Sequence, residues 1–223
     1  RIVVVSSKAS SIRAVKSIRA ELKISTSIAE DKENVTDYRF LGFDVESKPK
    51  FHKGGIQPVA MVQLATQSTA YLFRTKFEGM GKKSRGGGAW TPKLRNLLSD
   101  SNIIKVGVNV DGDIKSLRNI YGVNCCNSDS FLDLEKLVRT KWALPPRRLG
   151  LPGLTALLLQ RRLTKTQRMK NWEKTEMTDA MTEYAAADAF VSLDLLNKIS
   201  LFGTKRPRHQ RRQRSKPSTT TSN

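Results

Sequence analysis

Apolar runs predict strands in the first half of the chain. A short β-branched run opens the chain at residues 2–5, and further apolar runs follow at residues 40–46, 59–65 and 70–74. Short runs rich in Val, Ile, Phe and Tyr are typical of strands. A later apolar run at residues 103–110 predicts one more strand, which is expected to be buried.

Helical patterns occur between and after these strands. The first covers residues 11–23, where Ile12, Val15, Ile18 and Leu22 fall on one side of a helix. Further helices are predicted at residues 92–98, 113–121, 132–141, 154–159 and 178–199. Strands and helices in this order predict an α/β domain with a mixed sheet flanked by helices.

The chain divides into three predicted segments. A strand, a helix and a polar loop at residues 1–37 lead into a domain that covers residues 38–202. Residues 203–223 hold seven Lys and Arg, no acidic residue and almost no apolar one, so they predict a basic tail that cannot fold alone. A Gly- and Lys-rich stretch at residues 76–89 predicts a flexible loop. It is not a phosphate-binding P-loop, because Lys76 stands where that motif requires Gly.

Positive charge dominates the composition. The 223 residues include 40 Lys and Arg against 20 Asp and Glu, a formal net charge of +20. Without the tail, 33 basic residues remain against 20 acidic ones, so the rest of the chain is basic as well. Clustered cations neutralise phosphates and release counterions, which favours nucleic acid as the partner over a basic protein with scattered charge. The candidate nucleic-acid-binding residues are Arg147, Arg148, Arg161, Arg162, Lys165, Arg168 and Lys170, and in the tail Lys205, Arg206, Arg208, Arg211, Arg212 and Arg214.

Other residue types exclude several classes of protein. The two cysteines, Cys125 and Cys126, are adjacent, and His52 and His209 are the two histidines. This composition excludes a disulfide scaffold, a thiolate zinc cluster and a multi-His metal site, and it suits a reducing, intracellular compartment. The longest uncharged stretch, residues 54–73, contains Gln, Pro, Ser and Thr. It therefore indicates two strands with a turn, and no membrane partner is expected.

An acidic pair closes the predicted strand at residues 40–46. Asp44 and Glu46 are two residues apart, so their side chains point to the same face of the strand. Like charges this close repel and raise each other's pKa unless a cation lies between them. The same pattern also fits two solvated acids at a strand end.

Another acid lies within the last predicted helix. Spacings of 4, 3, 4, 3 and 4 residues place on one side of it Met177, Met181, Tyr184, Asp188, Val191 and Leu195. An unpaired carboxylate in a core-facing stripe is costly, so Asp188 is expected to be paired or bound to a metal. Tyr184 lies one turn before Asp188 on the same side. The alternative is an ion pair between Asp188 and an Arg, beside a packed Tyr184.

Two further acids, Asp111 and Asp113, follow the predicted strand at residues 103–110. In open α/β sheets, sites form at the carboxyl ends of strands. Asp113 could equally be a simple helix cap, and Asp111 is its rival as a ligand.

Together the acids provide oxygen ligands, which suit Mg²⁺ or Mn²⁺. Two such ions about 4 Å apart can clamp the attacking and leaving oxygens of a phosphoryl transfer. The basic surroundings would then bind a phosphodiester substrate.

Three motifs in order resemble those of the DEDD-type 3′→5′ exonucleases of the tyrosine subclass: Asp44-x-Glu46, Asn109-Val-Asp-Gly-Asp113 and Tyr184-Ala-Ala-Ala-Asp188. The chain is most similar to the Werner-type and RNase D-like exonuclease domains, over roughly residues 38–200, and Leu132-Asp133-Leu134 and Asn171-Trp172 also fit them. Ser47 departs from the Werner-type pattern, which usually has an aromatic residue after the Glu.

The resemblance implies a ribonuclease H-like fold and a two-metal site. Asp44, Glu46, Asp113 and Asp188 would hold two Mg²⁺ or Mn²⁺ ions, and Asp111 would not be a ligand. Tyr184 would orient or deprotonate the attacking water.

Two functions are therefore considered. The first is a metal-dependent 3′→5′ exonuclease, favoured because all five expected side chains are present. The second is a non-catalytic RNA-binding component of a large ribonucleoprotein, such as a mitochondrial ribosome, that reuses the fold. The basic tail fits a mitochondrial location and a nuclear or nucleolar one equally well. Both DNA and RNA fit as substrates.

Overall fold

The computed structural model describes residues 1–29, 39–49, 58–76, 78, 88–142 and 148–203. Most of the predicted loop at residues 76–89 lies outside these ranges, as does the predicted tail after Gly203.

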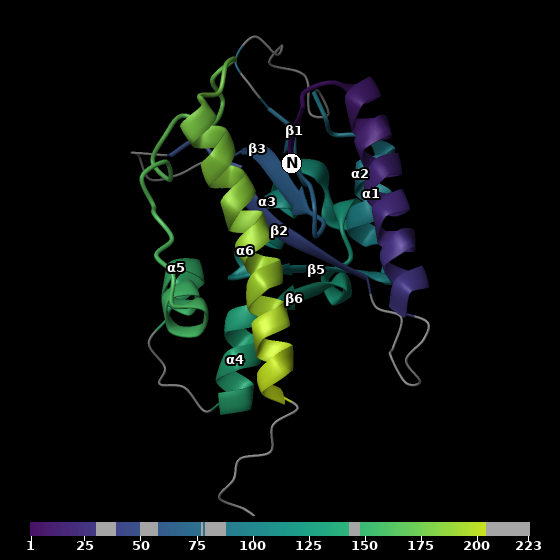
Figure 1. The fold of residues 1–223 in the computed structure, drawn as a ribbon. Helices are drawn as coiled ribbons and strands as arrows, with labels where there is room; N and C mark the ends of the chain where they lie inside the picture. The colour runs from purple at the N-terminus through teal and green to yellow at the C-terminus, as the bar shows by residue number, and fades with distance from the viewer. Residues whose placement is uncertain (30–38, 50–57, 77, 79–87, 143–147, 204–223) are drawn as a thin grey trace, which may run out of the picture.

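A six-stranded mixed sheet lies at the centre of the molecule (Figure 1). Its strands follow the spatial order β1-β4-β3-β2-β5-β6. They are β1 (Ile2–Val5), β2 (Arg39–Ser47), β3 (Val59–Ala65), β4 (Ala70–Arg74), β5 (Ile103–Gly107) and β6 (Phe131–Asp133). The pairs β2–β3 and β3–β4 are antiparallel, whereas β1–β4, β2–β5 and β5–β6 are parallel. The predicted α/β fold with a mixed sheet is confirmed.

Helices cover both faces of the sheet. They are α1 (Lys8–Ala29), α2 (Pro92–Ser99), α3 (Val110–Tyr121), α4 (Leu134–Trp142), α5 (Gly150–Leu154) and α6 (Asp179–Gly203). A π-helical turn, Thr155–Leu159, continues α5. Helices α1, α2 and α3 share one apolar cluster with Leu41 and Phe43 of β2. Helix α6 packs on the other face, against alanines of β3 and β4, and also contacts α4 and α5.

The alternation of β2 separates core from site. Leu41 and Phe43 are buried on the side of α1. Gly42 lies against α6, and Asp44 and Glu46 open into a cavity beside the same helix. One strand therefore supplies both the core of one face and the acids of the other.

Several predicted elements differ in extent or type from those in the structure. The strand predicted at residues 103–110 ends at Gly107, and α3 begins at Val110, because Asn109 adopts a left-handed conformation (φ 65°, ψ 33°) that turns the chain. The first two residues of the helix predicted at residues 132–141 belong instead to strand β6, which forms by pairing with β5, and helix α4 begins at Leu134. The piece predicted at residues 154–159 is the π-helical turn at the end of α5, which itself starts at Gly150.

The N-terminal segment takes part in the same sheet and core. Strand β1 pairs with β4 from Ile2 opposite Ala70 to Val5 opposite Phe73. Helix α1, longer than predicted, buries Val15 in the cluster that it shares with α2. The division into residues 1–37, 38–202 and 203–223 stays a prediction. In the described part of the chain, no helix has the length and apolar character needed to span a membrane.

Candidate functional site

Helix α6 crosses β2 in direct backbone contact at Gly42. A Cβ atom at Gly42 would lie 1.9 Å from the carbonyl oxygen of Ala189 and 3.3 Å from the Cγ of Leu193. Only glycine permits this approach. Asp44 follows Gly42 by two residues on the same face of the strand, and Asp188 precedes Ala189. The contact therefore brings a carboxylate of the strand beside a carboxylate of the helix.

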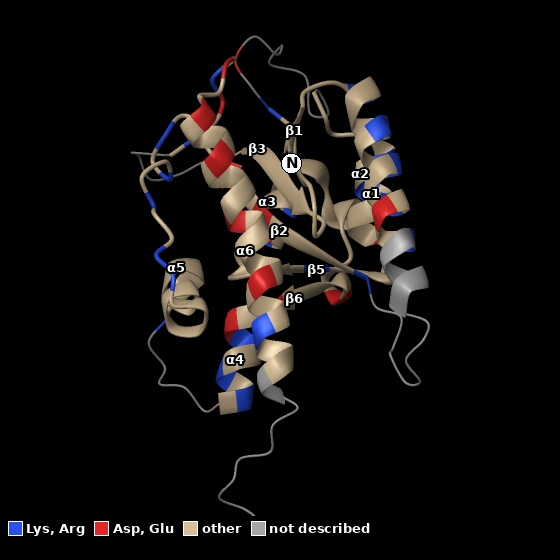
Figure 2. Cartoon of the chain, in the orientation of Figure 1, with Lys and Arg blue, Asp and Glu red and all other residues tan. Residues whose placement is uncertain are grey.

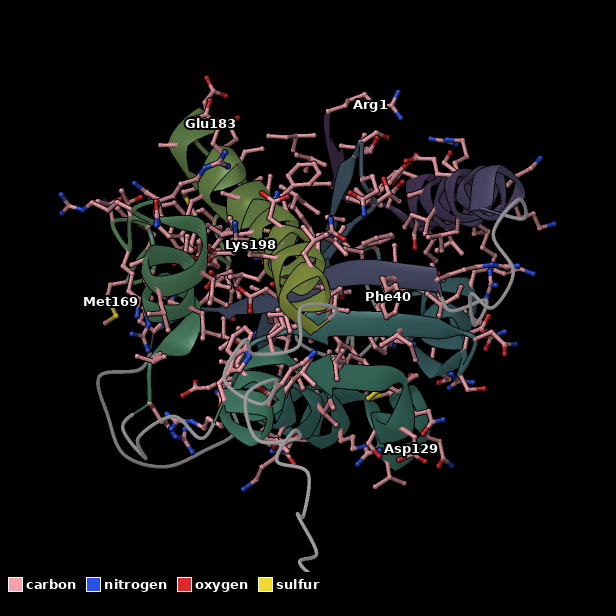
Figure 3. The ribbon with its side chains drawn as sticks, turned by 60° about the horizontal axis from the view of Figure 1, so that its bottom comes forward. Arg1, Phe40, Asp129, Met169, Glu183 and Lys198 are labelled. Carbon is pink, nitrogen blue, oxygen red and sulfur yellow. The ribbon has the colours of Figure 1, made fainter. Side chains whose placement is uncertain are left out.

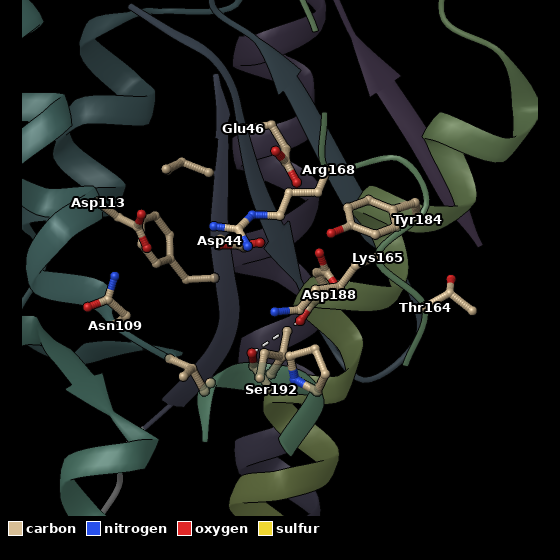
Figure 4. Close-up of a pocket in the computed structure, with 16 residues that line it drawn as sticks. Asp44, Glu46, Asn109, Asp113, Thr164, Lys165, Arg168, Tyr184, Asp188 and Ser192 are labelled. Atoms are coloured by element: carbon tan, nitrogen blue, oxygen red, sulfur yellow. Dashed lines mark hydrogen bonds between the residues drawn. The ribbon is translucent and has the colours of Figure 1, made fainter. Parts of the chain in front are cut away.

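Three carboxylates meet at this crossing. Asp44, Glu46 and Asp188 each present an oxygen, and these oxygens all lie within 4.8 Å of one another. Glu46 and Asp188 are only 8% and 5% exposed. Asp113, from the first turn of α3, lines the same cavity of about 220 Å³ (Figure 4). Among the described side chains, none of these four acids forms an ion pair with Lys or Arg.

Burial raises the pKa values of all four acids, and repulsion by neighbouring carboxylates adds to the rise for Asp44, Glu46 and Asp113. Burial, followed by the charge of Asp188, raises the pKa of Asp44 to about 8. Burial, followed by the other three carboxylates, raises the pKa of Glu46 to about 9, although Arg168 opposes the rise. Burial raises the pKa of Asp188 to about 7, opposed by the Tyr184 hydroxyl and by Lys165. The pKa of Asp113 lies well above its usual value because of burial and then the charges of Asp44 and Asp133.

The donor set fits a hard divalent cation. All four ligand candidates are carboxylates, which Mg²⁺ and Mn²⁺ prefer over soft or nitrogen ligands. A divalent ion among them would offset the repulsion that raises their pKa values. The residues therefore suit the metal that the sequence predicts, although the identity of the ion remains a proposal.

Tyr184 completes the wall formed by α6. Its side chain is half-buried, and its hydroxyl points into the cavity (Figure 4). Its ring packs 6.0 Å from that of Trp172, which is fully buried. Burial, followed by the charges of Asp188 and Glu46, raises the pKa of Tyr184 above its ordinary value. The phenol therefore keeps its proton near neutral pH and can donate a hydrogen bond.

The two aspartates at the start of α3 point in different directions. Asp113 faces the cavity, whereas Asp111 is exposed and pairs with Lys136 of α4. The rival ligand considered from the sequence is thus turned away from the other acids.

Asp133 positions this part of the site, a role that was not predicted from the sequence. Its Oδ2 accepts a hydrogen bond from the Val110 N–H at 3.2 Å, and its Oδ1 accepts one from the Glu135 N–H at 2.9 Å. It thereby ties the first turn of α3, which carries Asp113, to the start of α4. The sequence signal for this role is an aspartate directly before helix α4.

Two predicted nucleic-acid-binding residues face the carboxylates. Lys165 and Arg168 line the cavity from the segment between the π-helical turn and α6. Arg74 anchors the end of this segment, because its guanidinium donates to the carbonyl oxygens of Lys174 and Thr175, the latter at 2.5 Å.

The other predicted cations that the structure describes do not line the cavity. Arg148, Arg161, Arg162 and Lys170 are exposed, and Arg161 lies 4.0 Å from Asp194. The remainder lie outside the described residues, namely Arg147, Lys205, Arg206, Arg208, Arg211, Arg212 and Arg214.

Residues 19–202 match a family model described as "3'-5' exonuclease". A 3'-5' exonuclease of Arabidopsis thaliana is 30% identical over 171 residues, which cover 75% of this chain and 55% of that protein. The bifunctional 3'-5' exonuclease/ATP-dependent helicase WRN of Mus musculus is 29% identical over 172 residues, 76% of this chain and 11% of that protein. The chain thus spans little more than half the length of the plant relative and a small part of the mouse one.

Solved structures share the fold. The Aedes aegypti Nibbler EXO domain superposes with a TM-score of 0.68 at 20% identity, over 90% of this chain and 87% of that one. Escherichia coli RNase D superposes with a TM-score of 0.65 at 16% identity, over 91% of this chain and 46% of that one. These likenesses confirm the ribonuclease H-like fold implied by the sequence motifs.

Proposed function

The chain belongs to the 3′–5′ exonuclease family, and from that premise we propose that it hydrolyses phosphodiester bonds from the 3′ end of a nucleic acid with two Mg²⁺ or Mn²⁺ ions. The observation that carries this proposal is the cavity in which Asp44, Glu46, Asp113 and Asp188 converge, none of them in an ion pair with a described Lys or Arg. The alternative of a non-catalytic RNA-binding component is not favoured, because such a component needs no buried acidic cluster.

Each side chain has a distinct part in the proposed reaction. Asp44, Glu46, Asp113 and Asp188 would hold the ions. When bound, the ions supply positive charge that stabilises the attacking and leaving oxygens of the phosphodiester. Tyr184 would orient the attacking water through its hydroxyl, because burial holds the pKa of the phenol above its ordinary value.

The cationic wall of the cavity would bind the substrate. Lys165 and Arg168 carry the positive groups that face the carboxylates, and phosphate oxygens are their natural partners once the acids hold metal. Trp172 packs against the ring of Tyr184 and so restricts where the hydroxyl can point. A mitochondrial or nuclear location and a ribonucleoprotein partner stay predictions.

A gel assay tests the proposal. DNA and RNA oligonucleotides labelled at the 5′ end should shorten stepwise from the 3′ end with Mg²⁺ or Mn²⁺, and EDTA should stop the reaction. Asp188→Asn should abolish hydrolysis, because it removes a charged ligand from the cluster. Asp194→Asn is the matched control, since Asp194 is exposed on the same helix and outside the cavity. Degradation by Asp188→Asn at the parental rate would refute the metal assignment.

A further inference from the structure

Helices α1 and α2 present a surface whose exposed charges are all positive. The exposed cations are Lys8, Arg13, Lys16 and Lys23 of α1 and Lys93 and Arg95 of α2, called here the α1 face. These helices contain a single acid, Glu21, and Asp100 caps the end of α2. Figure 2 shows the basic residues along α1.

Both acids have partners inside the fold. Glu21 accepts hydrogen bonds from Thr66 at 2.5 Å, Ser68 at 2.9 Å and Tyr71 at 2.5 Å. Asp100 pairs with Arg19 at 2.8 Å. Neither carboxylate is therefore available to neutralise the α1 face.

Some cations elsewhere on the molecule pair with carboxylates of the fold. Lys136 pairs with Asp111, and Arg139 pairs with Glu135. In the described part of the chain, none of the six cations of the α1 face has a carboxylate partner. Their charge is therefore free to meet the phosphates of an external polyanion.

The α1 face is a fixed surface. Ser11 Oγ lies 3.0 Å from Thr91 Oγ1 near the start of both helices, and Arg19 meets Asp100 where α2 ends, so the helices run parallel in contact. Lys8, Lys16 and Lys23 follow spacings of eight and seven residues, which keeps them on one side of α1. At about 1.5 Å per residue, neighbouring lysines of this stripe are about 11 to 12 Å apart along the axis.

The α1 face is remote from the cavity. Helix α1 packs on the opposite face of β2 from Asp44 and α6. In Figures 1 and 3, α1 lies to the right, whereas α5 and the segment that carries Met169 lie to the left. Nucleic acid on this surface would be distinct from the nucleotides being cut.

We propose that the α1 face binds the phosphate backbone of a nucleic-acid duplex. Binding sites for single strands combine cations with aromatic side chains that stack on bases, but neither α1 nor α2 contains an aromatic residue. Phosphate contacts alone suffice to hold a duplex without reading its sequence. The lysine repeat is close to the width of a major groove, about 12 Å, so successive lysines can reach phosphates of both strands.

The inference rests on the proposed function only in taking nucleic acid as the ligand. Binding measured in EDTA tests the inference separately from hydrolysis, because hydrolysis needs the metal. The full chain is compared with K8Q/K16Q/K23Q and with K115Q/K136Q/K141Q, which removes the same charge from exposed positions of α3 and α4. A short blunt duplex and a single strand of equal length are titrated over a range of salt concentrations. K8R/K16R/K23R keeps the charge and serves as the rescue.

The α1 variant should flatten the slope of log affinity against log salt for the duplex by about 2 to 3, since each phosphate contact adds about 0.9. The α3/α4 variant should change that slope by less than about 1, and the Arg variant should restore it. The α1 variant should flatten the slope less for the single strand than for the duplex. Equal slopes for the two Gln variants on the duplex would overturn the inference, whether or not the chain proves to be an exonuclease.

Discussion

Like charges gather on both sides of the sheet, but the carboxylates beside α6 are largely buried, whereas the cations of the α1 face are exposed. In the cavity, loss of hydration raises the pKa values of Asp44, Glu46 and Asp188, and repulsion between carboxylates adds to the rise for Asp44 and Glu46. On the α1 face, water and salt screen the same kind of repulsion. Burial therefore suits a cluster of like charges to metal binding, whereas exposure suits one to salt-dependent docking.

This comparison predicts different consequences for substitutions in the two regions. Changes at the cavity should alter catalysis and the stability of the metal-free protein. Changes on the α1 face or in the tail should alter the affinity for nucleic acid, and this effect should shrink as the salt concentration rises. The predictions below run from the largest expected effect to the smallest.

Gly42→Ala should inactivate the protein almost as completely as loss of a ligand. The added methyl group would meet the backbone oxygen of Ala189, so α6 must shift and carry Asp188 away from Asp44. Overpacking of this kind costs about 1 to 3 kcal/mol of stability. Thermal unfolding and the gel assay measure both effects. Leu193→Ala in the same background should not rescue activity, because the obstruction is backbone. Parental activity in Gly42→Ala would show that the crossing is looser than described.

Tyr184→Phe should lower kcat by roughly 100- to 10,000-fold, the usual contribution of a group that positions or transfers protons in the chemical step. Affinity for oligonucleotides should change little, because the ring still packs on Trp172. Single-turnover kinetics together with binding in EDTA would separate the two parameters. An unchanged kcat would reduce Tyr184 to a packing residue.

The metal-free protein should lose stability as pH rises. The folded pKa values of Asp44 and Glu46, about 8 and about 9, exceed their ordinary values of 3.8 and 4.5. The folded state therefore binds more protons than the unfolded state between those limits, and the free energy of unfolding falls as pH rises through this range. The free energy of unfolding should stop changing with pH below the ordinary pKa values of 3.8 and 4.5, because both groups are then protonated in the folded and the unfolded state.

Asp188→Asn sharpens this test, because it removes one buried charge. In EDTA at about pH 8 the variant should be more stable than the parent by at least about 1 kcal/mol, and the gap should narrow as pH falls and close below about pH 4. Mg²⁺ should stabilise the parent more than the variant. Denaturant unfolding at both pH values measures these differences. A variant less stable than the parent in EDTA would mean that the acids are not in mutual repulsion.

Deletion of the predicted tail should have the smallest effect on chemistry. Comparison of the full chain with residues 1–202 should show a slope of log affinity against log salt on single strands that is flatter by roughly 3 to 5 units. Turnover on short, saturating substrate should barely change, because no cavity residue is lost. Identical slopes would leave the α1 face and the cations of the cavity as the basic surfaces that matter.

The sequence by itself determined the elements whose signals are local. The strands at residues 59–65 and 70–74 have the predicted bounds, because continuous apolar runs bounded by polar turns identify buried strands. The pairs Asp44–Glu46 and Tyr184–Asp188 were assigned to shared faces from periodicity alone, and the structure places each pair in one cavity. The order of the three acidic motifs identified the family.

Only the tertiary structure decided which of these faces meet. Strand β6 has three residues and exists because it pairs with β5. Asp113 turns into the cavity and Asp111 away from it because Asn109 and Asp133 set where α3 begins. The α1 face emerged only when packing showed which side of the helix is buried. Periodicity along the chain shows which residues share one side of a helix or strand. Contacts between distant segments, such as that of Gly42 with Ala189, depend on how whole elements pack.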